Sequence, residues 1–304
     1  MTEKQAGLSA IAMAYARAYH ATHDSSKIFD DFLADSLFTQ EEHIQMDQIW
    51  AGLLKYIDPE LAATNPDPAT ALAWVVQLTN GPMTLGRSRY TEDSLEEAIR
   101  KGVRQYIILG AGFDTFAFRR PDLADRLQVF EVDHPATQAL KREGVSRQSW
   151  NHPMNLHYIS TDFAQESLAD ALGRSPYDPS QLSFFSWLGV SFYLTREVVF
   201  DTLRGIASIA AQGSTIVFDY MDTDAFIPEK VAKRVQLMQW MAGQLGEPMK
   251  AGFDPLTLGA DLDRLGLRLE ENLDPAAIEA RYYQGRSDRY HAVEHVHFAR
   301  VVAA

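Results

Sequence analysis

The sequence predicts an α/β protein with a mostly parallel sheet. Beyond residue 100, short apolar runs alternate with segments of helical periodicity, which is the pattern of a parallel sheet covered by helices. A pair of glycines directly follows the first apolar run, and the chain before that run reads as helix. These three observations favour a helical N-terminal segment followed by a strand–helix core.

The first hundred residues contain apolar side chains at helical spacing and no strong strand candidate. Residues 8–23 begin this pattern, and Phe29, Phe32, Leu33 and Leu37 continue it. Further helices are expected over 41–57 and 69–78. We therefore expect residues 1–85 to form a helical cap segment.

The predicted strands alternate with helices from residue 105 onward. Compact apolar runs mark them at 105–109, 127–132, 156–160, 182–187 and 214–218, and two closing strands are expected at 267–273 and 292–302. Helices at 228–245 and 255–265 form an insertion over about 224–265. No linker divides the chain, so we expect a single domain, 1–304, whose core is 86–304.

Composition excludes several kinds of partner. The net charge is -13, which disfavours a nucleic-acid backbone or an anionic membrane surface. Cysteine is absent, so thiolate chemistry is excluded. No apolar run approaches the roughly 20 residues of a membrane span, and we expect a cytoplasmic protein of unspecified oligomeric state. His295 and His297 read as ordinary strand residues, so no metal site is expected.

The glycine pair and a later acid predict a nucleoside-binding loop. Gly110 and Gly112 follow the first strand, where glycine allows a sharp turn and a close approach of backbone to ligand. Asp133 ends the second strand, at about the 20-residue interval at which an acid binds ribose hydroxyls. The combination indicates a cofactor that contains adenosine.

Nicotinamide dinucleotides and S-adenosylmethionine (SAM) both use such a loop, and three residues favour SAM. A dinucleotide site needs a third glycine and a long helix facing the pyrophosphate, but Thr115 stands at that position and Pro121 interrupts the helix. Asp114 would repel a pyrophosphate, whereas it is compatible with the cationic side of SAM.

The chain resembles the leucine carboxyl methyltransferase family, in particular its bacterial branch of SAM-dependent methyltransferases. The similar segments are "RSRY" at 87–90, "LGAGFDT" at 109–115 and "FEVDHP" at 130–135. The resemblance covers nearly the whole chain. It implies a Rossmann-like class I methyltransferase sheet, mostly parallel with an antiparallel closing strand.

The resemblance also implies roles for individual residues. Gly110 would line the methionine part of SAM, and Asp133 would bind the ribose hydroxyls. Asp162 and Phe163 would border the adenine. Arg89 would pair with the SAM carboxylate.

Two arginines of the N-terminal half leave alternatives open. Arg87 is an alternative to Arg89, because the two stand two residues apart and cannot be aligned uniquely with the family. Arg17 is expected to be a solvated surface residue rather than a cofactor ligand.

One position departs from the family pattern. Leu188, in "WLGVSFYL", stands where the family often has a glutamate. This departure puts a protein-leucine carboxylate substrate in doubt and favours a different, more hydrophobic acceptor.

The expected activity is O-methylation of a small molecule, through a carboxylate or a hydroxyl. A carboxylate needs no general base, whereas a hydroxyl benefits from one; the candidate catalytic residues are Asp219, Tyr220 and Tyr193. The alternatives are a protein C-terminal carboxyl methyltransferase, a non-catalytic SAM-binding protein and, disfavoured, a nicotinamide oxidoreductase.

Overall fold

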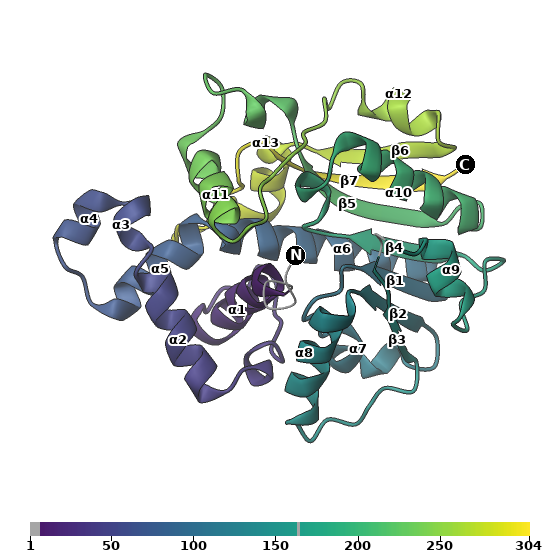
Figure 1. Ribbon diagram of the computed structural model, residues 1–304, viewed down its shortest axis with the longest axis horizontal. Helices are drawn as coiled ribbons and strands as arrows, with labels where there is room; N and C mark the ends of the chain where they lie inside the picture. The colour runs from purple at the N-terminus through teal and green to yellow at the C-terminus, as the bar shows by residue number, and fades with distance from the viewer. Residues whose placement is uncertain (1–6, 163–164) are drawn as a thin grey trace.

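A seven-stranded sheet forms the centre of the computed structural model, which describes residues 7–162 and 165–304. The strand order is β3-β2-β1-β4-β5-β7-β6, and only β7 runs antiparallel to its neighbours (Figure 1). The strands are β1 (Gln105–Leu109), β2 (Gln128–Asp133), β3 (Leu156–Ser160), β4 (Ser183–Trp187), β5 (Thr215–Met221), β6 (Leu267–Leu273) and β7 (Val296–Ala303). The predicted mostly parallel sheet with an antiparallel closing strand is confirmed.

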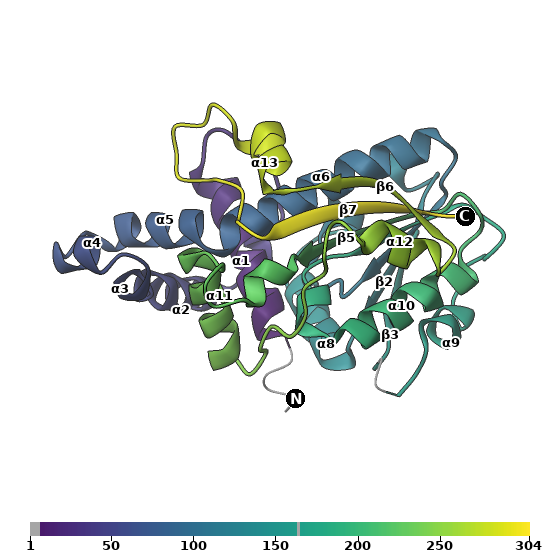
Figure 2. The same ribbon diagram turned by 90° about the horizontal axis from the view of Figure 1, so that it is seen from above.

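Helices cover both faces of this sheet. The main ones are α6 (Asn80–Arg100), α7 (Phe116–Arg119), α8 (Pro135–Ser146), α9 (Leu168–Gly173), α10 (Arg196–Ile209), α11 (Lys233–Gln244), α12 (Leu258–Asp263) and α13 (Pro275–Ile278). Tyr106 and Ile108 of β1 share a buried cluster with α6, whereas Ile107 and Leu109 join α9 and α10. This alternation follows from the two-residue period of a strand, and it places α6 opposite α9 and α10 (Figure 2).

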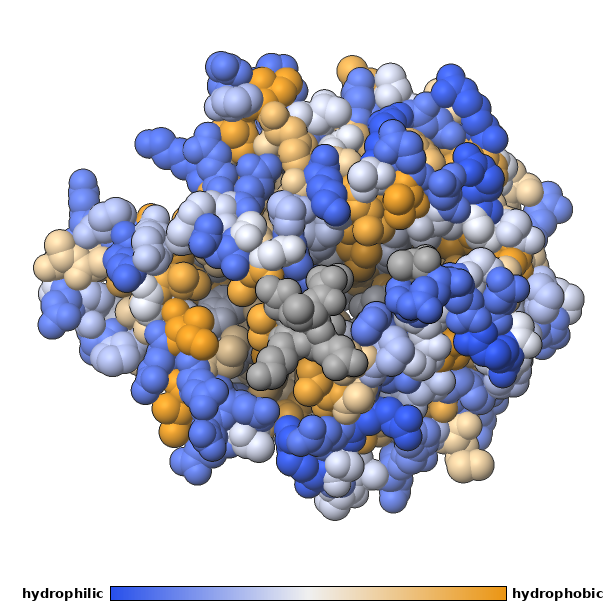
Figure 3. All heavy atoms as spheres, viewed as in Figure 1, coloured by the Kyte–Doolittle hydropathy of each residue, from blue (hydrophilic) through white to orange (hydrophobic). Residues whose placement is uncertain are grey.

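The N-terminal helices form a separate layer beside the sheet (Figure 1). They are α1 (Leu8–His23), α2 (Gln40–Ala51), α3 (Leu54–Ile57), α4 (Pro59–Ala63) and α5 (Pro68–Leu78). Tyr15, Trp50 and Val75 pack together in their core. Figure 3 shows mostly hydrophilic side chains on one face of the molecule, with hydrophobic ones gathered over α2, where Ile44 and Ile49 are exposed.

Three helices predicted from the sequence differ from the structure. The helix expected over 41–57 is divided into α2 and α3. The helix expected through Phe29–Leu37 is wrong, because only a short 3-10 turn at Asp35–Leu37 is helical there and Phe32 is 58% exposed. The helix expected from Pro228 begins only at Lys233, because a separate turn precedes it, in which the Val231 N–H donates to the Ile227 carbonyl.

The predicted division into segments stays a prediction. Helix α6 runs across the boundary between residues 85 and 86, and α11 and α12 lie between β5 and β6, in the predicted insertion. Within the described part of the chain, no helix combines the length and the apolar character needed to cross a bilayer.

Candidate active site

The loop after β1 exposes its backbone at the carboxyl end of the sheet. Gly110 is exposed, although all five residues of β1 are buried. Gly110 and Gly112 have φ angles of +69° and +53°, in the left-handed region that glycine tolerates best. A Cβ atom on Gly110 would lie 3.0 Å from Val190 Cγ2, and one on Gly112 would lie 3.1 Å from Ala10 Cβ. The loop therefore passes through a narrow space that side chains would fill.

Asp133 lies beside this loop at the end of β2. Its Oδ2 accepts the Gly112 N–H at 2.5 Å, and its Oδ1 accepts the His134 N–H at 2.6 Å. Burial raises the pKa of Asp133, and the two backbone N–H groups oppose this rise. Each oxygen retains a lone pair, so the carboxylate can still accept hydrogen bonds from a diol.

Asp114 occupies the start of the helix that follows the loop. Its Oδ1 accepts the Phe116 N–H at 2.7 Å, which places a carboxylate at the N-terminus of α7. Helix α7 is four residues long and is followed by a 3-10 turn at Pro121–Leu123. A pyrophosphate would meet an occupied and very short helix N-terminus, so this loop does not fit a dinucleotide.

Asp162 follows β3, the strand that pairs with β2, two residues after its last residue. Asp133 is paired with Ser160 in the parallel register, and the Thr161 N–H donates to the Asp133 carbonyl at 3.0 Å. Asp162 is partly exposed, and its Oδ2 accepts from Gln165 Nε2 at 2.9 Å. Phe163, the other predicted adenine contact, lies outside the described residues.

Arg87 and Arg89 lie on different sides of α6. The Arg87 side chain is 7% exposed, and its Nη1 donates to Asp219 Oδ2 at 3.0 Å. The Arg87 guanidinium also lies against Gly189, in the loop after β4. Its other N–H donors have no partner within residues 7–162 and 165–304. Arg87 thus offers free N–H donors at the carboxyl end of the sheet, where Gly110 also lies.

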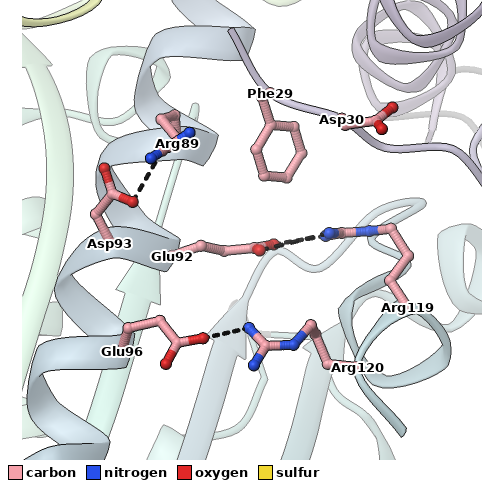
Figure 4. A pocket seen from close by; sticks show the side chains of 8 residues that line it. All are labelled: Phe29, Asp30, Arg89, Glu92, Asp93, Glu96, Arg119 and Arg120. Atoms are coloured by element: carbon pink, nitrogen blue, oxygen red, sulfur yellow. Dashed lines mark hydrogen bonds and ion pairs between the residues drawn. The ribbon is translucent and has the colours of Figure 1, made fainter. Parts of the chain in front are cut away.

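Arg89 faces a pocket of about 220 Å³ between α6 and α7 (Figure 4). Its Nε donates to Asp93 Oδ1 at 2.8 Å, and its side chain is 50% exposed. The same pocket holds the ion pairs of Arg119 with Glu92 and of Arg120 with Glu96. Each of the three arginines is therefore paired with a carboxylate.

A buried ionic cluster supports the glycine loop from the N-terminal layer. Arg17 donates to Asp31 Oδ2 at 2.8 Å and to the Phe113 carbonyl at 2.9 Å. Asp31 also accepts from the Thr115 hydroxyl. Burial opposes ionisation of Asp31, but the guanidinium groups of Arg17 and Arg119 outweigh it and lower its pKa. The predicted surface position of Arg17 is wrong, since its side chain is 12% exposed.

Little in the sequence indicates this cluster. Asp31 stands within an apolar stretch that resembles a helix face. Its partners lie far away in the chain, so only the fold brings them together. The available signal was an acid between the aromatic residues Phe29 and Phe32, because an acid that is buried among apolar side chains needs a cationic partner.

The three candidate catalytic residues do not converge on one point. Asp219 and Tyr220 are adjacent on β5 and completely buried, and successive strand residues point to opposite faces. The Tyr220 hydroxyl donates to Asn272 Oδ1 at 3.0 Å, and its ring stacks on His297. Asp219 instead faces Arg87. Tyr193 lies in a 3-10 turn at Ser191–Tyr193 and is partly exposed.

Tyr193 and Leu188 belong to the segment that follows β4. Burial raises the pKa of Tyr193 to about 12, and the Glu247 charge adds to this rise. Its hydroxyl has no hydrogen-bond partner in the described residues. Leu188 lines a small cavity of about 20 Å³ together with Arg17 and Asp114. This segment thus presents a neutral donor and an apolar side chain.

Comparison with known proteins decides the family. The sequence profile described as leucine carboxyl methyltransferase matches residues 10–207. The chain belongs to the leucine carboxyl methyltransferase family. A relative from Bacillus subtilis, YktD, carries the provisional name of S-adenosyl-L-methionine-dependent methyltransferase. It is 37% identical over 303 residues, which cover 99% of either chain.

A further relative and a solved structure are also similar to this chain. A Parafrankia protein with the same kind of provisional name is 27% identical over 213 residues, 70% of this chain and 62% of its own. The crystal structure of a duf574 family protein from Streptomyces avermitilis has a TM-score of 0.57 at 13% identity, covering 96% of this chain and 97% of that chain. This likeness shows a shared fold.

The methyltransferase therefore depends on SAM. The residues at the carboxyl ends of its parallel strands fit that cofactor chemically. The Gly110 backbone fits the methionine chain of SAM, Asp133 fits its ribose diol and the remaining donors of Arg87 fit its carboxylate. The short α7, with a carboxylate at its N-terminus, agrees with a cofactor that has no phosphate.

Proposed function

We propose that this methyltransferase transfers the methyl group of SAM to a carboxylate of a small molecule. The observation that carries the proposal is that none of the three candidate bases is free to take a proton. Asp219 is completely buried in an ion pair with Arg87. Tyr220 is completely buried and faces away from Asp219. Tyr193 has a raised pKa, so it is a neutral phenol at pH 7.

A carboxylate acceptor suits a site without a base. It is already ionised at neutral pH, so no proton has to be removed before or during the reaction. When bound, SAM supplies an activated methyl group on a positively charged sulfur. The acceptor oxygen forms a bond to the methyl carbon as the carbon–sulfur bond breaks, giving a methyl ester and S-adenosylhomocysteine.

The chain's own residues then bind and orient. In this proposal Asp133 holds the ribose diol, Asp162 borders the adenine and Arg87, rather than Arg89, binds the cofactor carboxylate. The buried position of Arg87 and the outward pairing of Arg89 with Asp93 support that choice. Orientation and exclusion of water can lower the barrier by several kcal/mol, on the order of 7 or more in well-aligned cases.

The segment after β4 would contact the acceptor. Tyr193 would donate its unpartnered hydroxyl to an acceptor oxygen, and Leu188 would supply an apolar contact. Replacement of a carboxylate by leucine at this position removes a negative charge that would repel an anionic acceptor. Both features agree with a carboxylate attached to a hydrophobic body.

A protein C-terminal carboxylate is the second candidate. It shares the chemistry and the family description supports it, whereas Leu188 departs from the glutamate that the family often has. The two candidates differ in the size of the acceptor and not in the reaction.

The test is an acceptor screen with matched pairs and methyl-labelled SAM. Each hydrophobic carboxylic acid is paired with its primary alcohol, and a peptide ending in leucine is paired with its C-terminal amide. We expect label on acids and none on alcohols. Label on alcohols alone would overturn the carboxylate proposal, and label on the free-acid peptide alone would favour the protein substrate.

A further inference from the structure

We infer that Asp219 is a positioning residue, which holds Arg87 and the loop after β4 in the arrangement that cofactor binding needs. This inference rests on the proposed contact between Arg87 and the cofactor carboxylate. It gives Asp219 a different role from the general base considered from the sequence.

Asp219 uses three of its oxygens to join separate elements. Its Oδ2 accepts from Arg87 Nη1 on α6 at 3.0 Å, and its Oδ1 accepts the Gly189 N–H at 2.6 Å. Its backbone carbonyl accepts from the Ser191 hydroxyl at 2.5 Å. The side chain is completely buried, so each carboxylate oxygen needs such a partner. Asp219 therefore connects β5 to α6 and, twice, to the loop after β4.

Gly189 shows how closely Arg87 is held against that loop. Its φ angle is +70°, and a Cβ atom there would lie 2.5 Å from Arg87 Nη2 and 2.8 Å from Arg87 Cζ. The guanidinium plane thus packs directly on the loop backbone. Asp219 bonds both partners of this contact, which fixes the direction in which the remaining Arg87 donors point.

The same loop reaches the glycine segment after β1. Val190 follows Gly189, and its Cγ2 would lie 3.0 Å from a Cβ atom on Gly110. Loss of the Asp219 carboxylate would therefore disturb two things at once. The Arg87 donors would lose their orientation. The loop that places Val190 beside Gly110 would lose the hydrogen bond from the Gly189 N–H to Asp219.

Two ligands separate this positioning role from a general loss of structure. S-adenosylhomocysteine carries the amino-acid carboxylate, whereas 5′-methylthioadenosine has the same nucleoside and thioether without it. If Asp219 acts through Arg87, Asp219→Asn weakens binding of S-adenosylhomocysteine at least tenfold and binding of methylthioadenosine less than threefold. General damage to the site would weaken both ligands equally.

Calorimetric titration of both ligands, with thermal unfolding of each variant, tests the inference. Gly189→Ala displaces Arg87 by another route, and we expect the same selective loss; it serves as the second variant if Asp219→Asn does not fold. Asp201→Asn is the matched control, because it makes the same change in an exposed ion pair with Arg204 on α10. We expect both affinities of the control to stay within twofold of the parent.

Equal weakening of both ligands, or no weakening of either, in a folded Asp219→Asn or Gly189→Ala protein would overturn the inference. No acceptor is present in these titrations. A failure of the carboxylate proposal in the acceptor screen would therefore leave this result unaffected, and the two failures can be told apart.

Discussion

The Gly112 N–H donates to Asp133 Oδ2 at 2.5 Å, and this bond joins the loop after β1 to the carboxyl end of β2. It orients a carboxylate beside the loop that contains the exposed Gly110 backbone. Ordering of this carboxylate before the cofactor binds lowers the entropy that binding has to overcome. The bond also joins the two halves of the motif, 109–115 and 130–135.

Asp133→Ala removes the proposed acceptor of the ribose hydroxyls. A hydrogen bond to a charged group contributes about 1.5–3 kcal/mol, so we expect the SAM dissociation constant to rise at least tenfold in a calorimetric titration. Asp122→Ala is the control, because Asp122 is a more exposed carboxylate that pairs with Arg120. An unchanged affinity in Asp133→Ala would move the ribose contact elsewhere.

Arg87→Lys and Arg89→Lys distinguish the two arginines. Lysine keeps the charge but loses the planar, two-pronged geometry that matches a carboxylate. We expect Arg87→Lys to weaken SAM binding at least tenfold. Arg89→Lys alters only a half-exposed pair with Asp93, which contributes about 1 kcal/mol or less to stability. A larger effect of Arg89→Lys on SAM affinity would reverse the assignment.

Tyr193→Phe removes the proposed hydrogen bond to the acceptor. A neutral hydrogen bond contributes about 0.5–1.5 kcal/mol, so the acceptor KM should rise roughly threefold to tenfold, while the affinity for S-adenosylhomocysteine stays constant. Steady-state kinetics with an acceptor from the screen provide the measurement. A hundredfold fall in kcat with unchanged KM would instead indicate proton transfer by Tyr193.

His297 should make stability depend on pH. Burial lowers its pKa, although Asp222 opposes this shift. Below about pH 6.5 the unfolded chain takes up a proton that the folded chain resists, so the free energy of unfolding should fall as the pH is lowered from 7.5 to 5.5. His297 also faces His295, Asp274 and the ring of Tyr220. These groups are unchanged in a variant that replaces His297 alone.

His297→Asn should flatten this dependence on pH, as measured by urea unfolding at several pH values. His152→Asn, at an exposed position, is the control. An identical slope in the parent and in His297→Asn would show that His297 does not cause it.

The strands were predictable because their apolar runs are short and bounded by turns. β1, β3 and β6 begin and end at the predicted residues, and the remaining strands differ by a few residues at their ends. The glycine loop and Asp133 could also be predicted, since both halves of that contact lie at strand ends. Local sequence was sufficient for these features.

Other features depend on packing that local sequence does not reveal. Residues two apart on a helix point about 200° apart, so Arg87 and Arg89 are expected on opposite sides. The segment "RSRY" does not show which of the two sides is buried. Asp31 stands in an apparent helical pattern, but the segment is not helical. Its side chain instead pairs with Arg17 on α1 and Arg119 on α7. Local sequence does not distinguish Asp219 from an ordinary acid at the end of a predicted strand, because its partner Arg87 stands 132 residues earlier.

The fate of the transferred methyl group tests the carboxylate proposal most directly. A methyl ester releases methanol in mild alkali, whereas a methyl ether does not. With labelled SAM and an acceptor from the screen, the account predicts that alkali converts all transferred label into volatile methanol. Label that remains on the product after alkali would contradict it.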